Sequence, residues 1–149
     1  MTRRHVLGML GGAAVAVALP ARAAAPRVTV YKSPTCGCCG HWVDHMRAAG
    51  FEAVVDETVG PAVQRKRAGI ADAYGSCHTA MVDGYALEGH VPAQDVRRLL
   101  KERPVAIGLA VPRMVPGSPG MEDPGGNKVP YDVLLLDRQG GSRIFNHYA

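Results

Sequence analysis

The sequence predicts a single α/β domain behind an export signal, and two observations support this prediction. Strand-like and helix-like segments alternate along most of the chain, as they do in α/β folds. Three cysteines, Cys36, Cys38 and Cys39, crowd into the turn between the first strand-like run and the first helix-like run. About 125 of the 149 residues follow the export signal, which is enough for one domain with its own hydrophobic core.

The first 23 residues have the pattern of a signal peptide, with cleavage expected by about residue 25. Arg3 and Arg4 precede an uncharged run over residues 6–21, and small residues follow it. The run is short and contains glycines, which argues against the alternative of a retained membrane anchor. The paired arginines resemble a twin-arginine export signal, although two basic residues are also ordinary for Sec export. We therefore expect a periplasmic bacterial protein that has no membrane segment after signal cleavage.

The charge balance argues against a nucleic-acid partner. Three of the 17 basic side chains lie in residues 1–23, so 14 basic side chains balance 13 acidic ones in the mature chain. Aromatic residues make up 5% of the sequence, which is too few for a base-stacking platform. The sequence therefore predicts no binding to nucleic acid.

The first half of the mature chain predicts two strands around a helix. Residues 28–31 are apolar and predict the first strand. After the cysteine turn, apolar residues recur on one face over residues 40–49, and Gly50 marks the end of this helix. Residues 51–55 predict a second strand.

The next segment predicts helix, hairpin and helix. A helix over residues 61–68 starts at a proline and ends before a glycine. Strands over residues 79–82 and 85–88 flank Asp83-Gly84, a two-residue hairpin signal. A helix with an apolar stripe then starts at Pro92 and stops before Pro104.

The last part predicts a long loop and a closing hairpin. Residues 111–130 are rich in glycine and proline and show no periodicity, which is typical of a functional or flexible loop. Residues 131–136 and 142–145 predict the two strands of a C-terminal hairpin.

This order of elements resembles the thioredoxin-like fold over most of residues 27–103. Cys36 and Cys39 match the two cysteines of the family's CxxC motif. The resemblance implies a three-layer α/β fold, to which this chain adds the Gly/Pro-rich loop and the extra C-terminal hairpin. At the position of the family's cis-proline, which packs opposite the CxxC motif, this chain has His78 preceded by Cys77. The resemblance therefore implies that Cys77 and His78 face Cys36, so that four thiols converge.

Four converging thiols favour a soft metal over dithiol chemistry. A dithiol enzyme needs one attacking and one resolving sulfur, and two more sulfurs beside them would invite wrong pairings. Thiolates select Cu(I), and more sulfurs than one tetrahedral ion can use favour several bridged ions. Zinc is the competing metal, but its usual pattern is two well-separated CxxC pairs.

The chain also resembles, more closely, the small periplasmic copper-resistance proteins of the CopG type. The matching segments cover nearly the whole mature chain: Ser33–Cys39 followed by Trp42, Ser76–Thr79, Glu88–Pro92 and Gly117–Met121. This resemblance implies that residues 27–149 form a thioredoxin-like copper-binding domain with several Cu(I) ions in a cysteine-bridged cluster. Arg113 departs from the family, which usually has glycine there, so the course of the loop near Met114 stays open.

The residues predicted to bind metal come from the cysteine turn, the segment before the hairpin and the long loop. They are Cys36, Cys38, Cys39, Cys77, His78, Met114 and Met121. Both methionines lie in the Gly/Pro-rich loop and not on an apolar face, which favours a role as ligand or cluster cover over core packing. Of the other histidines, His41 and His45 are assigned to a solvated helix face, His90 to capping or packing, and His147 has no clear placement.

Three functional hypotheses follow. The first is a periplasmic copper-binding protein for copper resistance, with redox or electron-transfer activity as an extension and a periplasmic redox or copper-handling protein as partner. The second is a thiol–disulfide oxidoreductase with Cys36 as nucleophile and Cys39 as resolving thiol, although it lacks the cis-proline. The third is an inert domain held by two disulfides, whose partner surface is the Gly/Pro-rich loop.

Overall fold

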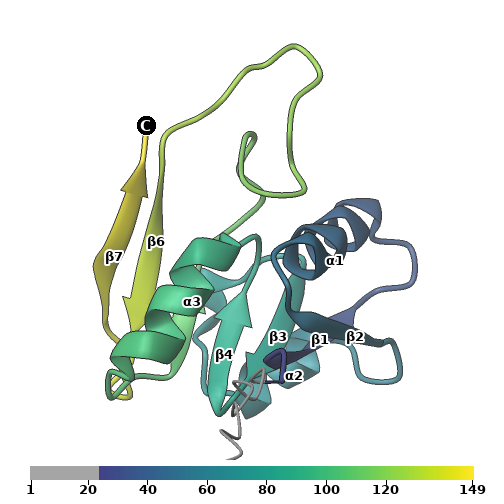
Figure 1. Cartoon of the computed structure of the whole chain (residues 1–149). Coiled ribbons are helices and arrows are strands. Elements are labelled where there is room, and N and C mark those ends of the chain that lie inside the picture. The colour runs from purple at the N-terminus through teal and green to yellow at the C-terminus, as the bar shows by residue number, and fades with distance from the viewer. Residues whose placement is uncertain (1–23) are drawn as a thin grey trace, which may run out of the picture.

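A single seven-stranded sheet runs through the part of the chain that the computed structural model describes, residues 24–149 (Figure 1). The strands are β1 (Arg27–Lys32), β2 (Glu52–Asp56), β3 (His78–Val82), β4 (Tyr85–Glu88), β5 (Gly108–Ala110), β6 (Tyr131–Leu136) and β7 (Ser142–Tyr148). Their order in the sheet is β2-β1-β3-β4-β5-β6-β7. β1 pairs in parallel with β2 and antiparallel with β3, and β3 and β4 form an antiparallel hairpin.

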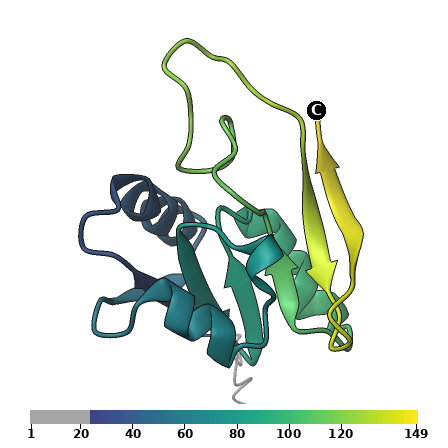
Figure 2. The same ribbon diagram turned by 180° about the vertical axis from the view of Figure 1, so that it is seen from behind.

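Helices cover both faces of this sheet. They are α1 (Gly37–Ala48), α2 (Pro61–Arg67) and α3 (Ala93–Glu102), with a short 3₁₀ helix at Asp72–Tyr74. α1 and α3 lie on one face and α2 lies on the other (Figures 1 and 2). The larger hydrophobic cluster fills the α1 and α3 side, and a smaller one around Ile70 fills the α2 side. The prediction of an α/β fold is confirmed, and the elements over residues 27–103 follow one another in the predicted order.

The first helix begins earlier than the sequence predicts. α1 starts at Gly37 instead of residue 40, and Cys36 is its N-cap residue, with an extended backbone at φ −81° and ψ 97°. Apolar periodicity could not reveal this start, because the first turn contains only glycine and cysteine. Cys38 and Cys39 therefore lie within the first helical turn, where backbone N–H groups have no partner inside the helix.

The sequence analysis missed strand β5. It has three residues and joins the parallel neighbour β4 to the antiparallel neighbour β6. A Cβ atom at Gly108 would lie 1.7 Å from the Ala86 carbonyl oxygen, so glycine allows the two strands to approach. Through β5 the predicted C-terminal hairpin becomes part of the main sheet. Its second strand, β7, continues to Tyr148, three residues beyond the predicted end.

The predicted turn at Asp83-Gly84 and the predicted long loop over residues 111–130 are both present. Asp83 and Gly84 both have positive φ, 47° and 85°, as a two-residue turn between β3 and β4 requires. Residues 111–130 contain no helix or strand, and in Figure 1 this loop rises past α1 before it returns to β6. The loop therefore belongs to the α1 end of the molecule, where the cysteines lie.

None of the helices in residues 24–149 combines the length and the apolar character that a membrane crossing needs. The predicted signal peptide, residues 1–23, lies outside the described residues.

Candidate metal centre

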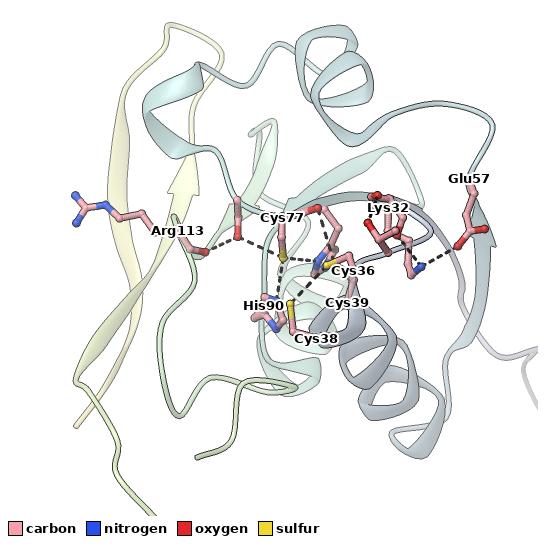
Figure 3. The surroundings of a disulfide bond; sticks show 12 residues. Lys32, Cys36, Cys38, Cys39, Glu57, Cys77, His90 and Arg113 are labelled. Carbon is pink, nitrogen blue, oxygen red and sulfur yellow. Dashed lines mark hydrogen bonds and ion pairs between the residues drawn. A yellow bond between two sulfur atoms is a disulfide. The ribbon is translucent and has the colours of Figure 1, made fainter. Parts of the chain in front are cut away.

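Four cysteine sulfurs meet at the N-terminus of α1. The Sγ atoms of Cys36, Cys38, Cys39 and Cys77 all lie within 4.8 Å of one another (Figure 3). Three of them come from the turn into α1, and Cys77 comes from the residue before β3. Antiparallel pairing of Lys32 at the end of β1 with His78 at the start of β3 brings these segments together. The predicted convergence of Cys77 on the other three cysteines is therefore present in the structure.

Two of these cysteines form a disulfide. Cys36 is bonded to Cys39, whereas Cys38 and Cys77 are free and partly exposed. The Cys38 Sγ atom lies 3.5 Å from the Cys36 Sγ atom. All four cysteines of the chain fall within the described residues, so the alternative of two structural disulfides is wrong. Reduction of the Cys36–Cys39 bond would present four thiols in one place.

Two histidines extend the site on the side of Cys77. The Cys77 Sγ atom lies 3.1 Å from Nε2 of His90 and 3.5 Å from Nδ1 of His78. The Nδ1–H of His90 donates to the Pro119 carbonyl oxygen at 2.7 Å, which leaves Nε2 with its lone pair toward the sulfur. These three residues form a second group of potential metal ligands that shares Cys77 with the cysteine group.

His90 is the site residue that sequence reasoning missed. The sequence analysis assigned it to capping or packing, but its ring is fully buried against the cysteine site. The sequence contained a signal for this role, because His90 follows the end of the predicted hairpin by only two residues. What the sequence could not show was the contact of the loop with this ring, in which the Pro119 carbonyl oxygen accepts a hydrogen bond from His90.

Burial sets the protonation of these groups. It lowers the pKa of His78 to about 3, and it also lowers the pKa of His90, so both imidazoles are neutral near pH 7. Burial and the neighbouring Cys38 raise the pKa of the Cys77 thiol to about 12. Neutral imidazole is the form that binds metals, whereas a metal would have to displace the Cys77 proton.

His78 is packed tightly, and one of its two ring nitrogens has no polar partner within residues 24–149. Its ring lies 4.4 Å from the Trp42 ring and 5.1 Å from the His90 ring, measured between centroids. Its Nε2 atom is buried and has no hydrogen-bond partner within residues 24–149. Such orphaned buried nitrogens are rare in folded proteins and fit a functional role for the ring.

The buried carboxylate of Glu88 supports the segment that carries Cys77. It accepts hydrogen bonds from the Ser76 backbone N–H at 2.7 Å and from the Thr79 hydroxyl at 2.6 Å. Arg65 of α2 donates to the same carboxylate at 3.2 Å. Since Ser76 and Thr79 flank Cys77 and His78, this single side chain fixes both ends of the segment. Burial raises the pKa of Glu88, although its hydrogen bonds and Arg65 oppose the shift.

The Gly/Pro-rich loop closes over the first turns of α1. A Cβ atom at Gly120, whose φ is +83°, would lie 2.7 Å from the Trp42 backbone nitrogen and 3.0 Å from the Cys38 carbonyl oxygen. Only glycine therefore lets the loop pack this closely, and the contact places the Pro119 carbonyl against His90.

The loop start also contacts the Cys77 segment. The Arg113 N–H donates to the Gly75 carbonyl oxygen at 3.0 Å, and the Ser76 hydroxyl donates to the Arg113 carbonyl oxygen. The guanidinium of Arg113 points away from the cysteines in Figure 3. Among the predicted methionine ligands, Met114 is 49% exposed and Met121 is partly buried. Their roles as ligands stay predictions.

The remaining histidines of residues 24–149 lie outside the two ligand groups. His41 is exposed, as predicted for the solvated face of α1. The same prediction is wrong for His45, because its Nε2 atom accepts a hydrogen bond at 3.1 Å from the Ala93 N–H at the start of α3, and burial lowers its pKa. His147 lies on β7 and pairs with Asp132 at 2.7 Å.

Comparison with known proteins gives a family and two similar structures. The family model described as "Protein of unknown function, DUF411" matches residues 74–121, which include Cys77, His78, His90 and the centre of the loop. No curated protein matches the chain. A solved structure described as "Copper resistance protein copG- Form 2" is 38% identical, with a TM-score of 0.77, over 84% of this chain and 99% of that one.

A second solved structure, "Copper resistance protein copG- Form 1", is also 38% identical, with a TM-score of 0.76. The match covers 82% of this chain and 96% of that chain. Identity at this level over nearly the full length of both structures exceeds a likeness of fold alone. Together with the converging cysteines that the sequence resemblance implied, these matches show that the chain belongs to the CopG family of copper resistance proteins.

Proposed function

We propose that this protein binds copper for copper resistance and holds several Cu(I) ions in a cysteine-bridged cluster. The observation that carries the proposal is the approach of four cysteine sulfurs to within 4.8 Å of one another. Thiolates are soft ligands that prefer Cu(I), and sulfurs this close can bridge neighbouring ions. The solved structures that the chain resembles are described as copper resistance proteins, which supports copper as the metal.

The composition of the site supports a cluster over a single structural ion. One tetrahedral zinc ion uses four ligands, but here four sulfurs are joined by the neutral imidazoles of His78 and His90. Cys38 and Cys39 are adjacent in one helical turn, which makes it hard for both to bind the same ion as Cys36. Bridging removes this constraint, because each sulfur then serves two ions. Met121, Met114 and His78 complete the proposed ligand set.

The cluster requires the reduced form of the Cys36–Cys39 pair. Reduction frees two thiols, and each thiol that binds Cu(I) gives up its proton. Because bridged copper can change valence, oxidoreductase or electron-transfer activity is the proposed extension of this function. The proposed location is the periplasm, reached by the export signal of residues 1–23, with a periplasmic redox or copper-handling protein as partner.

Anaerobic copper titration of the reduced mature domain tests the proposal. We expect native mass spectra to show several Cu(I) ions per chain in competition with a Cu(I) chelator. Cys77→Ser and Cys36→Ser should each abolish the multi-ion species, because every sulfur bridges. His41→Ala is the matched control, since this exposed imidazole lies on the same helix outside both ligand groups. A maximum of one ion per chain would contradict the cluster.

The disulfide supports a second candidate function, thiol–disulfide exchange. Cys36 is the N-cap of α1 and is bonded to Cys39, the arrangement that a dithiol enzyme uses in its oxidised state. An insulin-reduction assay distinguishes the two functions. Strong reductase activity that is lost in Cys36→Ser, together with weak copper binding by the reduced protein, would replace the copper function with this one.

A further inference from the structure

We propose that the disulfide form of the protein retains a site for one metal ion, built from Cys77, His78 and His90. This inference rests on the proposed copper function for its physiological meaning, and its experiment separates the two. The Cys36–Cys39 disulfide removes two of the four sulfurs from metal binding, but it leaves the other two free.

Three donors converge outside the disulfide, and the free Cys38 thiol lies next to one of them. The Sγ atoms of Cys38 and Cys77 lie within 4.8 Å of each other. Cys77 Sγ, a ring nitrogen of His78 and a ring nitrogen of His90 satisfy the same limit. Cys38 belongs to the cysteine group and not to the group of the two histidines. Cys77 thus forms a set of one sulfur and two imidazole nitrogens with His78 and His90.

This donor set suits one divalent ion. One thiolate and two imidazoles supply three ligands of a tetrahedral zinc or cobalt ion, and water takes the fourth position, as in open zinc sites. With only two sulfurs free, the thiolate bridges that a multi-ion cluster needs are no longer available. The disulfide form should therefore have a capacity of one ion, and copper would share this site with divalent zinc or cobalt.

The surroundings hold the donors in place without the metal. The Pro119 carbonyl fixes the tautomer of His90, so its Nε2 atom faces Cys77. Glu88 binds the backbone on one side of Cys77 and the Thr79 hydroxyl on the other. The His78 ring is packed against Trp42, and its Nδ1 atom faces the Cys77 sulfur at 3.5 Å.

Reduction then changes the capacity of the site. A dithiol reductant transfers two electrons and two protons to the Cys36–Cys39 bond, which yields two thiols and leaves the reductant as a disulfide. No bond to Cys38 or Cys77 changes in this step. The two new thiols add to the existing pair, and the site changes from one ion to several. Copper loading would therefore follow the redox state of one disulfide.

Cobalt titration of the disulfide form tests the inference, because Co²⁺ reports tetrahedral sulfur coordination in its absorption spectrum and does not reduce disulfides. The protein is the unalkylated mature chain, and the Cys36–Cys39 bond is confirmed on a separate portion by peptide mapping after alkylation of Cys38 and Cys77. We expect one Co²⁺ per chain, a sulfur-to-cobalt charge-transfer band, and displacement of the cobalt by one Zn²⁺.

Variants identify the ligands. Cys77→Ser should remove the charge-transfer band, because Cys77 is the thiolate of the set, whereas Cys38→Ser should keep it. His90→Ala should weaken Co²⁺ binding about tenfold or more. The double variant C36S/C39S should keep one Co²⁺ when it is held reduced, although it can no longer form the cluster. His41→Ala should bind like the parent chain. Far-UV circular dichroism confirms that each variant is folded.

The outcomes for the two proposals differ. No cobalt binding in the disulfide form, or binding that survives both Cys77→Ser and His90→Ala, would overturn the single-ion site. Several Cu(I) ions in the reduced chain would still support the cluster in that case. Conversely, one Co²⁺ in the disulfide form with no Cu(I) uptake after reduction would support the site and reject the proposed function.

Discussion

At the scale of single residues, a buried charge pair anchors the segment that carries Cys77. Glu88 is fully buried and Arg65 is 15% exposed at its side chain, and the carboxylate receives three donors. Neither residue belongs to the cysteine site itself. Glu88 accepts hydrogen bonds from residues on both sides of Cys77, and Arg65 belongs to α2. The ion pair therefore links α2, on one face of the sheet, to the segment that carries Cys77.

Loss of Arg65 should destabilise the fold strongly. We expect Arg65→Met to lower the free energy of unfolding by about 3 kcal/mol, because it leaves the Glu88 carboxylate buried without its cation. Urea unfolding at pH 7 measures the change. The double variant R65M/E88Q should recover part of the loss, since a neutral amide costs less to bury than an unpaired charge. Equal loss in both variants would show that the charge pair is not the cause.

Arg113 lies in a backbone conformation that favours glycine. Its φ is 65°, in the left-handed region, and its backbone is fixed by hydrogen bonds to Gly75 and Ser76. The sequence comparison had already singled out this position, where the family usually has glycine. The structure shows the physical reason, since a side chain makes the left-handed conformation costly. The loop nevertheless has the left-handed conformation at Arg113.

Arg113→Gly should therefore stabilise the protein. The expected gain in the free energy of unfolding is about 1 kcal/mol at most, since relief of left-handed strain is partly offset by the greater freedom of glycine in the unfolded chain. Thermal unfolding of the metal-free protein measures it. Arg113→Ala is the control, because it removes the guanidinium but keeps the Cβ atom, and it should show no gain.

At the scale of elements, the contact between the Gly/Pro-rich loop and α1 determines the geometry of His90. Gly120 packs on the backbone of Cys38 and Trp42, and the carbonyl oxygen of the preceding residue, Pro119, accepts a hydrogen bond from the Nδ1–H of His90. The sequence marked residues 111–130 as a functional loop because they lack periodicity. It could not show that the loop docks on α1, since that contact depends on the positive φ of Gly120 and joins segments that lie far apart in the chain.

Gly120→Ala should disrupt this contact. The new Cβ atom would lie 2.7 Å from the Trp42 nitrogen, and the backbone there is helical and cannot move away. We expect faster proteolysis within residues 111–130 and an affinity for Cu(I) lowered about tenfold, because His90 loses the partner that orients it. Gly126→Ala is the matched control, because Gly126 also has positive φ but has open space around it. Equal effects of the two substitutions would show that backbone strain alone is responsible.

At the scale of the whole molecule, strand β5 makes the C-terminal hairpin part of one continuous sheet. Val133, Leu135 and Phe145 of the hairpin belong to the same hydrophobic cluster as Val28 and Val30 of β1. The sequence predicted the hairpin and most of the strands from alternation and turn signals. It did not predict that the hairpin joins the other strands in one sheet. The connecting strand, β5, has only three residues, which are too few to show a recognisable pattern.

The domain should consequently unfold as one unit. We expect Phe145→Ala to cost about 3 kcal/mol through the cavity that it leaves, together with the loss of the contact between the Phe145 ring and the Arg98 guanidinium 4.2 Å away. Far-UV circular dichroism and hydrogen exchange of β1 should report the same shifted midpoint. A separate early transition confined to β6 and β7 would contradict this expectation.

The same scale shows how much of the metal centre the sequence could reveal. The crowding of Cys36, Cys38 and Cys39 was visible directly, and the resemblance to a known order of elements placed Cys77 opposite them. His90 and the disulfide could not be derived in this way. The position of His90 depends on strand register and on a loop carbonyl, and the disulfide is one of several pairings that the spacing allows.

The packing of Trp42 against His78 gives the protein an optical label of its own. The chain contains one tryptophan, and its ring is fully buried, 4.4 Å from the His78 ring. The indole N–H donates to the Val91 carbonyl oxygen at 2.9 Å, which holds the ring in place. All tryptophan emission therefore originates beside the candidate metal centre. Quenching of that emission by copper would follow each loading and release step in real time, without a dye or a tag.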